Sequence, residues 1–337
     1  MNLHLKERTR TMTLSISRRH ATALLLALPA TRLAFAQDNW PSRPIKLVVP
    51  YPPGGNSDNL GRIVAERIAA QLNATIIVDN KPGGTTQIGT ELVARAAPDG
   101  YTLLLGAITA FTVLPHLRKK LPFDPKRSFE PLGAIADYVA VAAARKDLGV
   151  ATLADLVRVA KANPGKLTYG SAGLSSFGHI AGEIIKRDAG IDMLHVPFKG
   201  SADAAAALAG GQIDFLIDGT TVQLAKGARA VALFAFSDKR HPELPNVPSL
   251  PETGLQVKRP TGASWGLFAP AGTPKAIADK LAKALERALA EPDTQARMQR
   301  ISAMPAWGSP AELMRGVDND FRFYGELLPA IGLNAED

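Results

Sequence analysis

Apolar runs alternate with amphipathic segments along most of the chain, a pattern typical of an α/β fold. In the first part, apolar runs at 45–49, 75–79 and 101–105 predict strands, and the segments at 60–69 and 88–97 predict helices between them. This βαβαβ order implies a parallel sheet with right-handed crossovers. Because ligands of such sheets bind at the carboxyl ends of the strands, the glycine turns after the first two strands are candidate binding sites.

A second group of strands and helices follows, and the chain then returns to the first group. The predicted strands lie at 139–142, 167–169, 193–196, 213–217 and 231–236, with helices at 153–162, 177–188 and 202–209. A returning strand is predicted at 265–269, and helices at 276–290, 294–301 and 311–328. We expect two lobes, each a mostly parallel sheet flanked by helices: lobe 1 is formed by 37–140 and 263–337, and lobe 2 by 141–262.

Residues 1–36 have the features of an export signal. Basic residues that include Arg18 and Arg19 precede a short apolar core at 21–28, and Ala34-Phe35-Ala36 is a small-residue cleavage pattern. The apolar core is too short to span a bilayer, so we expect cleavage near Ala36 and a periplasmic mature protein. The Arg18-Arg19 pair leaves both general and twin-arginine export open. Met12 is an alternative start to Met1.

The charge of the chain comes largely from this leader. Six basic residues and one acidic residue give residues 1–36 a net charge of +5, which leaves +3 of the total of +8 for the mature chain. We therefore expect no nucleic-acid partner. The chain has no cysteine, and its six histidines lack His-x-x-x-His spacing, so we expect neither a disulfide framework nor a metal site.

The first glycine turn has the composition of an anion site. It reads Pro50-Tyr51-Pro52-Pro53-Gly54-Gly55-Asn56-Ser57-Asp58 and connects a predicted strand to a predicted helix. Asn56, Ser57 and Asp58 are all good N-cap types, so the helix should begin within a residue or two of them. A helix start presents free backbone N–H groups at a positive dipole end, which accepts an anion without a basic side chain. The alternative is an ordinary connection that binds nothing.

Several motifs in a fixed order resemble one known family. The chain is similar to the Bug (Bordetella uptake gene) proteins, the substrate-binding components of tripartite tricarboxylate transporters. The similarity rests on the first glycine turn and on Trp40–Ile45, Asn80–Gly84, Val93–Leu104, Thr168–Gly173, Val196–Gly200, Gly210–Asp214 and Leu267–Pro274. Together these motifs extend over nearly the whole chain.

The resemblance implies a two-lobed type II periplasmic-binding-protein (Venus flytrap) fold that captures a small organic carboxylate between its lobes. It implies no catalysis and no cofactor, and it implies membrane permease subunits as partners; we expect a monomer. The ligand-binding residues that it implies are Tyr51, Pro53, Gly54, Gly55, Asn56, Ser57 and Asp58 in the first turn, Gly84, Thr85, Thr86 and Gln87 in the second turn, and Ser171, Ala172, Gly173, His179 and Asp218 in lobe 2.

Two departures from the family pattern lie near the expected cleft. Thr85, Thr86 and Gln87 replace part of a glycine-rich string, and the segment at 107–115 lacks an asparagine before its proline. Both departures bear on which carboxylate is bound. Phe111 and Tyr51 are candidates for an apolar wall, but we favour Phe111 as a core residue.

A periplasmic hydrolase is the first alternative function. It would use Asp58, Asp214 or Asp218 as a general base, or Ser171 or Ser175 as a nucleophile activated by His179. We favour structural roles: Asp58 as a helix N-cap, Asp214 in a hydrogen bond between elements, and His179 bonded to the backbone. The chain has no phosphate-binding loop of the Gly-x-x-x-x-Gly-Lys-Ser/Thr type.

Two further alternatives concern the partner. A ligand-sensing domain of a transcription regulator would need a DNA-binding module where this chain has its leader, so we reject that alternative. A protein that presents its ligand to a periplasmic sensor remains open. The expected mechanism is docking of a carboxylate on amides of the Gly54–Asp58 and Gly83–Gln87 turns, followed by closure of lobe 2 through Ser171–Gly173.

Overall fold

The computed structural model describes residues 40–255 and 264–335. The following description concerns the compact unit that begins at Pro41. The expected signal peptide at 1–36, with its cleavage site near Ala36, lies outside the described residues. Among the helices that the structure describes, none has the length and apolar character needed to cross a membrane.

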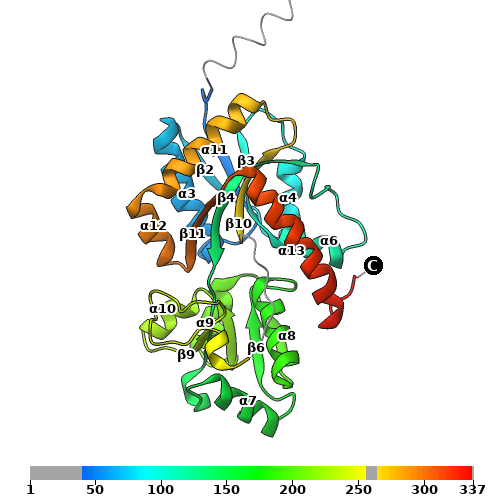
Figure 1. Cartoon of the computed structure of the whole chain (residues 1–337), viewed down its shortest axis with the longest axis vertical. Helices are drawn as coiled ribbons and strands as arrows, with labels where there is room; N and C mark the ends of the chain where they lie inside the picture. Colours follow the sequence, from blue (N-terminus) through cyan, green and yellow to red (C-terminus); the bar gives the residue numbers. More distant parts are fainter. Residues whose placement is uncertain (1–39, 256–263, 336–337) are drawn as a thin grey trace, which may run out of the picture. The chain divides into compact units, whose positions relative to one another are not determined.

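The first lobe is built on a six-stranded sheet (Figure 1). Its strands are β1 (Ile45–Val49), β2 (Ile76–Asn80), β3 (Thr102–Ala107), β4 (Phe129–Tyr138), β10 (Trp265–Pro270) and β11 (Ala303–Gly308), in the order β11-β4-β10-β3-β1-β2. Strand β1 is parallel to β2 and β3, whereas β10 is antiparallel to β3 and β4, and β11 is antiparallel to β4. The carboxyl ends of β1, β2 and β3 therefore meet at one edge of this sheet.

The second lobe is built on a five-stranded sheet. Its strands are β5 (Val141–Ala144), β6 (Thr168–Ser171), β7 (Leu194–Pro197), β8 (Phe215–Asp218) and β9 (Val231–Ala235), in the order β7-β6-β8-β5-β9. Strand β6 is parallel to β7 and β8, and β5 is antiparallel to β8 and β9. The α/β architecture is as expected, but both sheets are mixed rather than mostly parallel, because β10 and β11 in the first sheet and β5 in the second run against their neighbours.

Helices flank both sheets. They are α3 (Asn56–Leu72), α4 (Gln87–Ala94), α5 (Thr109–Thr112), α6 (Leu114–Leu117), α7 (Leu153–Ala162), α8 (Phe177–Ala189), α9 (Ser201–Ala209), α10 (Thr221–Lys226), α11 (Lys275–Ala290), α12 (Pro292–Gln299) and α13 (Pro310–Ala330), with short 3₁₀ turns at Lys146–Leu148 and Pro251–Thr253. Local sequence determines several ends: Thr152 and Asp155 form a capping box at α7, and Ser309 and Glu312 form another at α13.

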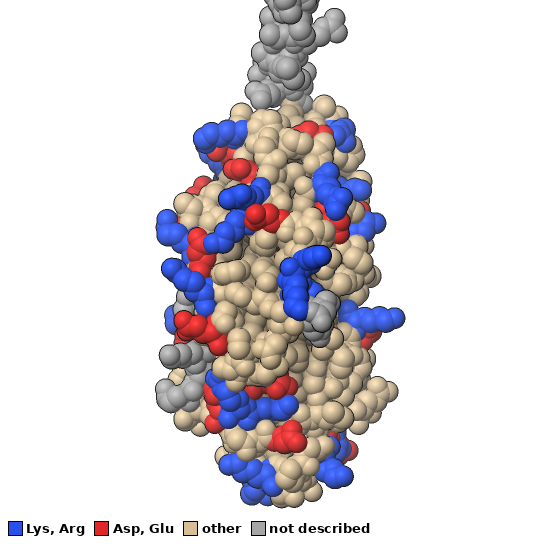
Figure 2. All heavy atoms as spheres, turned by 90° about the vertical axis from the view of Figure 1, so that its right-hand side faces the viewer, with Lys and Arg blue, Asp and Glu red and all other residues tan. Residues whose placement is uncertain are grey.

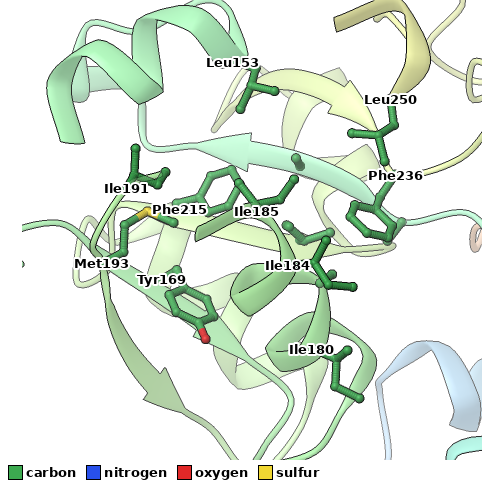
Figure 3. Packing of buried hydrophobic residues seen from close by; sticks show 14 of the residues in the cluster. Leu153, Tyr169, Ile180, Ile184, Ile185, Ile191, Met193, Phe215, Phe236 and Leu250 are labelled. Carbon is green, nitrogen blue, oxygen red and sulfur yellow. The ribbon is translucent and has the colours of Figure 1, made fainter. Parts of the chain in front are cut away.

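The second sheet packs its apolar side chains against α7 and α8. Tyr169 and Phe215 lie on adjacent strands and are fully buried, and Ile184 and Ile185 of α8 pack in the same cluster (Figure 3). This packing fixes α8 relative to β6, the strand that ends at Ser171. The turn between β6 and α8 is therefore held by a core on both sides.

Acidic and basic side chains lie side by side on the face of the molecule shown in Figure 2. Arg297 pairs with Glu66, and Lys126 pairs with Asp318. Exposed pairs of this kind contribute only about 0–1 kcal/mol each to stability. The cores of the two lobes, rather than these pairs, determine the fold.

Candidate functional site

The first glycine turn leaves several backbone donors free. Gly54 has a φ of 87°, and Gly55 is the N-cap of α3. The Gly54 amide donates to Asp58 Oδ2 over 2.9 Å, so it is not available to a ligand as we had expected. Within the described part of the chain, the amides of Gly55, Asn56 and Ser57 have no hydrogen-bond acceptor, as is usual at the start of a helix.

Asp58 stabilises this turn from the first turn of α3 and is not the N-cap that we expected. Besides Gly54, its carboxylate accepts hydrogen bonds from Arg62 Nε over 3.1 Å and from Asn80 Nδ2 over 3.0 Å. Burial acts to raise the pKa of Asp58, but the hydrogen bonds from Arg62, Gly54 and Asn80 outweigh it and lower the pKa. Asp58 is thus an ionised carboxylate that ties the turn to the end of β2.

The second turn is backbone-strained. Thr85 and Thr86 have φ values of 52° and 75°, a region that β-branched residues rarely adopt. The amide of Gln87 donates to the Gly84 carbonyl over 3.1 Å and is therefore used within the turn. Thr86 is only 3% exposed, and its hydroxyl has no hydrogen-bond partner among the described residues.

The third turn, between β6 and α8, is held by two stacked histidines. The Ser171 hydroxyl donates to the Gly173 carbonyl over 2.9 Å and lies 2.7 Å from His195 Nε2. The Ser175 amide donates to His179 Nδ1 over 3.0 Å, and the rings of His179 and His195 stack with centroids 4.0 Å apart. Burial lowers the pKa of His179, and burial, with the neighbouring His179, lowers that of His195 to about 3.

Asp218, at the end of β8, is surrounded by donors. Its Oδ2 accepts from Ser201 Oγ over 2.8 Å, and its Oδ1 accepts from the Thr220 amide over 2.9 Å. The Tyr138 hydroxyl bonds to the same carboxylate, and it also accepts from the Gly219 amide and from Asn56 Nδ2. Burial, followed by the Asp218 charge, raises the pKa of Tyr138 well above its usual value.

Two adjoining pockets lie among these turns. Pocket A is lined by Tyr51, Pro52, Pro53, Gly55, Asn56, Ser57, Ala107, Ile108, Thr109, Thr112, Tyr138, Ala172, Ser176, Phe177, Gly178, Gly200, Ser201, Ala202, Asp203, Asp218, Ser264, Trp265, Asp320 and Tyr324. Pocket B is lined by Pro50, Tyr51, Pro52, Pro82, Gly83, Thr85, Thr86, Ala172, Gly173, Leu174, Ser176, Phe198 and Lys199. The pockets share Tyr51, Pro52, Ala172 and Ser176, and both have walls from each lobe.

Three helix N-termini reach pocket A. Its lining includes 55–57 at the start of α3, 176–178 at the start of α8 and 200–203 at the start of α9. No lysine or arginine of the described residues lines this pocket. Each helix N-terminus carries about half a positive charge and unpaired amides, so the pocket attracts anions through the backbone. The carboxylates of Asp203, Asp218 and Asp320 also line this pocket and oppose the attraction. The opposition from Asp218 is partial, because its oxygens already accept hydrogen bonds.

Most of the residues predicted from the sequence line one of the pockets. Those that do are Tyr51, Pro53, Gly55, Asn56, Ser57, Thr85, Thr86, Ala172, Gly173 and Asp218. Those that do not are Gly54, Asp58, Gly84, Gln87, Ser171 and His179. Gly54 and Asp58 are hydrogen-bonded to each other. Ser171 and His179 form hydrogen bonds with Gly173 and Ser175 of the third turn. A direct ligand contact remains a prediction for all sixteen residues, whether or not they line a pocket.

Several pocket residues were missed by the sequence analysis. Tyr138 is the last residue of β4, a strand that was not predicted. Asp320 and Tyr324 lie on the last helix, far from the turns in sequence. Ser176 and Lys199 were within reach, since Ser176 stands directly before the helix predicted at 177–188 and Lys199 stands three residues before the helix predicted at 202–209. A search of helix starts for polar residues would have found them.

Two residues weighed for the site are structural. Phe111 is 1% exposed and stacks on Phe268 with ring centroids 4.4 Å apart, which confirms that it belongs to the core. Asp214 accepts from the Thr168 amide over 2.7 Å and pairs with Arg145, so its expected bond between elements is also confirmed. Neither residue lines pocket A or pocket B.

A comparison with known families gives a match over most of the chain. The model of the family described as "Tripartite tricarboxylate transporter family receptor" (TctC) matches residues 60–333. A UPF0065 protein from the tcbD-tcbE intergenic region of Pseudomonas sp. (strain P51) is 33% identical over 332 residues. This alignment covers 95% of the chain and 96% of that protein.

Solved structures give the same result. The structure titled "periplasmic binding protein BugD" shares 35% identity and superposes with a TM-score of 0.83, covering 88% of this chain and all of BugD. A protein of R. palustris, solved with adipate, shares 30% identity with a TM-score of 0.84, over 88% of this chain and all of that one. The chain therefore has the two-lobed fold of the periplasmic binding proteins.

Proposed function

Since the chain belongs to the TctC family of tripartite tricarboxylate transporter receptors, we propose that it is a periplasmic solute-binding protein for a small organic carboxylate. The observation that carries this proposal is the meeting of three helix N-termini at pocket A. The adipate in the R. palustris structure supports a carboxylate as the ligand class.

The free amides of pocket A are the proposed carboxylate donors. Those of Gly55, Asn56 and Ser57 have no acceptor within the described residues, and they belong to lobe 1. The starts of α8 and α9 approach from lobe 2. Hydrogen bonds from amides to an ionised carboxylate are about twice as strong as those between neutral groups. A ligand held by both sets of donors would favour the conformation in which the lobes are closed on it.

The proposed lobes are 37–140 with 263–337, and 141–262. In this arrangement, lobe 1 provides the first and second turns, and lobe 2 provides the third turn and Asp218. The closed, ligand-bound form would deliver the carboxylate to the permease subunits of a tripartite transporter, and the protein would act as a monomer. Presentation of the ligand to a periplasmic sensor would use the same site.

The hydrolase alternative gains no support from the geometry. Ser171 lies near His195, but its side chain is fully buried and it lines neither pocket. A nucleophile must reach its substrate, so this serine–histidine pair is better explained as a support for the third turn. The receptor family itself consists of solute-binding proteins.

Thermal-shift measurements on the mature protein test the proposal. A panel of C4–C8 dicarboxylates, citrate and acidic amino acids should contain ligands that raise the melting temperature, because a ligand that binds only the native state stabilises it. Each ligand should be recovered unchanged. Absence of any shift across the panel, or chemical conversion of a ligand, would contradict the proposal.

A further inference from the structure

Pocket B contains a cation that the protein itself does not neutralise. Lys199 is exposed and, among the described residues, is the single lysine or arginine that lines either pocket. In the part of the chain that the structure describes, its ammonium forms no hydrogen bond and no ion pair within 4.0 Å. An anion that entered pocket B would be the first partner of this charge.

The position of Lys199 is electrostatically unfavourable without such an anion. Lys199 directly precedes Gly200, the N-cap of α9. Cations are disfavoured near a helix N-terminus, typically by about 0.3–1 kcal/mol at the surface. Ser176, the N-cap of α8, lines the same pocket, so a second positive helix end lies nearby. Lys199 and these helix ends therefore attract negative charge jointly.

Two hydroxyl groups in the walls of pocket B also lack partners. Thr86 from lobe 1 and Ser176 from lobe 2 are 3% and 6% exposed, and neither side-chain oxygen has a hydrogen-bond partner among the described residues. Ser176 is an N-cap whose hydroxyl does not cap its helix. A buried hydroxyl without a partner is unfavourable, so both groups have a reason to bind whatever enters the pocket.

Both hydroxyls sit next to strained backbone. Thr85 and Thr86 have positive φ values, and so does Ser175, with a φ of 61°. Strain of this kind costs about 1–3 kcal/mol per residue and is concentrated at ligand sites. Rotation about χ1 has three staggered positions, so a hydroxyl can change direction without a change of the backbone.

We propose that pocket B is the subsite for a second anionic group of the ligand, with Lys199 as its countercharge and the hydroxyls of Thr86 and Ser176 as its hydrogen-bond donors. This inference rests on the proposed function, in which the first carboxylate lies on the amides of pocket A. The two pockets adjoin through Tyr51 and Ala172. The ligand class is therefore an organic acid with a carboxylate at each end.

Matched ligands test this assignment. Adipate and hexanoate have chains of the same length, but hexanoate lacks the second carboxylate. Titration calorimetry of the mature protein should show adipate binding more than tenfold tighter than hexanoate. Lys199→Met should weaken adipate binding about tenfold, which corresponds to about 1.4 kcal/mol, and leave hexanoate binding unchanged. Lys283→Met, which removes an exposed lysine on α11, should change neither affinity.

A variant of Thr86 should raise the stability of the free protein and lower its affinity for adipate. Thr86→Val keeps the shape of the side chain and removes an unpartnered hydroxyl, so it should raise the melting temperature of the free protein by about 2 °C. It should also weaken adipate binding several-fold. Lower stability together with unchanged adipate binding would overturn the role given to this hydroxyl.

The remaining outcomes separate this inference from the proposed function. Equal affinities for adipate and hexanoate, or an equal loss of both in Lys199→Met, would overturn the second subsite and leave carboxylate binding intact. If no carboxylate of the panel bound, adipate and hexanoate included, the proposed function and the second subsite would both be wrong.

Discussion

Tyr138 is one of the residues through which the two lobes share hydrogen bonds. Its hydroxyl accepts from the Gly219 amide of lobe 2 and from the Asn56 side chain of lobe 1, and it bonds to the Asp218 carboxylate. The ring packs edge-to-face on Trp265 and Phe177, with centroids 5.1 Å away in both cases. The Tyr138 side chain thus connects several segments that line pocket A.

Replacement of this hydroxyl should affect both stability and binding. Tyr138→Phe leaves the Gly219 amide without its acceptor, which should lower the free energy of unfolding by about 1–3 kcal/mol. It should also weaken carboxylate binding, because Asp218 loses a donor. Urea unfolding and calorimetry measure the two effects. Tyr101→Phe, at an exposed hydroxyl that bonds Ser42, should change stability by less than about 0.5 kcal/mol, and an equal loss in both variants would contradict the role of Tyr138.

The neutral histidines behind the third turn should make stability depend on pH. The pKa of His195 is about 3 in the folded protein, lowered by burial, by His179 and by Lys186, whereas in the unfolded chain it is about 6.5. Between these values the unfolded chain binds the extra proton, so stability is lost as the pH falls below about 6.5. With allowance for its partial exposure, His195 should account for about 1 kcal/mol of the loss between pH 7 and pH 5.

Urea unfolding at both pH values measures this dependence. His195→Gln keeps a polar side chain near Ser171 without a titrating ring, so the loss on acidification should become smaller in the variant. Parallel pH dependence in the two proteins would show that other groups cause the loss.

At the scale of the elements, the starts of α3, α8 and α9 make pocket A. Gly55 is the critical residue of the first start, because a Cβ added to it would lie 3.8 Å from the Ser201 Cβ of lobe 2. Its φ of −83° suits any residue, whereas the φ of 87° at Gly54 does not. A substitution at Gly55 therefore changes the pocket with little effect on the turn.

A graded series at Gly55 tests the backbone site. Gly55→Ala adds a methyl group in ordinary van der Waals contact and should weaken binding only slightly. Gly55→Val adds branches that would fill the space between α3 and α9, so carboxylate binding should fall by at least a hundredfold. The melting temperature of both free variants should stay within a few degrees of the wild type. Full affinity in Gly55→Val would exclude the amides of this turn as the docking site.

The sequence predicted the elements that follow regular periodicity and missed those with irregular backbone. Strands β1 to β3 and helices α7 to α9 lie within a few residues of their expected positions. Strand β4 was missed because Pro131 and Gly133 interrupt its pattern; Pro131 lies where the register against β10 shifts, which is where a sheet tolerates proline. Strand β11 contains Pro305 and is an edge strand.

Only those parts of the site that are continuous in the sequence could be predicted. Each glycine turn is a continuous segment of the chain, so its composition alone indicates backbone donors. The partners of those turns are distant in sequence: the Asn56 side chain meets Tyr138, 82 residues away, and Trp265 bonds Ser57, 208 residues away. Periodicity carries no information about such pairs, because the packing of the sheets decides them.

At the scale of the whole molecule, the lobes meet closely at Gly219. A Cβ added there would lie 2.1 Å from Asn56 Nδ2 and 2.8 Å from the Ser302 Cβ, both in lobe 1. The Ser302 hydroxyl also donates to the Gly219 carbonyl over 3.0 Å. Glycine at this position allows the end of β8 to approach the first sheet.

Gly219→Ala should keep the lobes apart at this point. We expect adipate to reduce the radius of gyration of the wild type, and the variant to show a smaller reduction together with about tenfold weaker binding. Small-angle X-ray scattering with and without adipate measures the first effect, and calorimetry the second. Equal scattering changes in both proteins would show that the contact at Gly219 has no part in closure.

The absence of basic side chains among the described residues around pocket A has a consequence for the environment in which the protein works. Main-chain amides neither gain nor lose protons over the range in which bacteria grow, so their attraction for a carboxylate stays constant. In acid surroundings, binding would weaken as the carboxylic acid of the solute becomes neutral. Among competing acids, the stronger ones would then be retained longest as the medium acidifies.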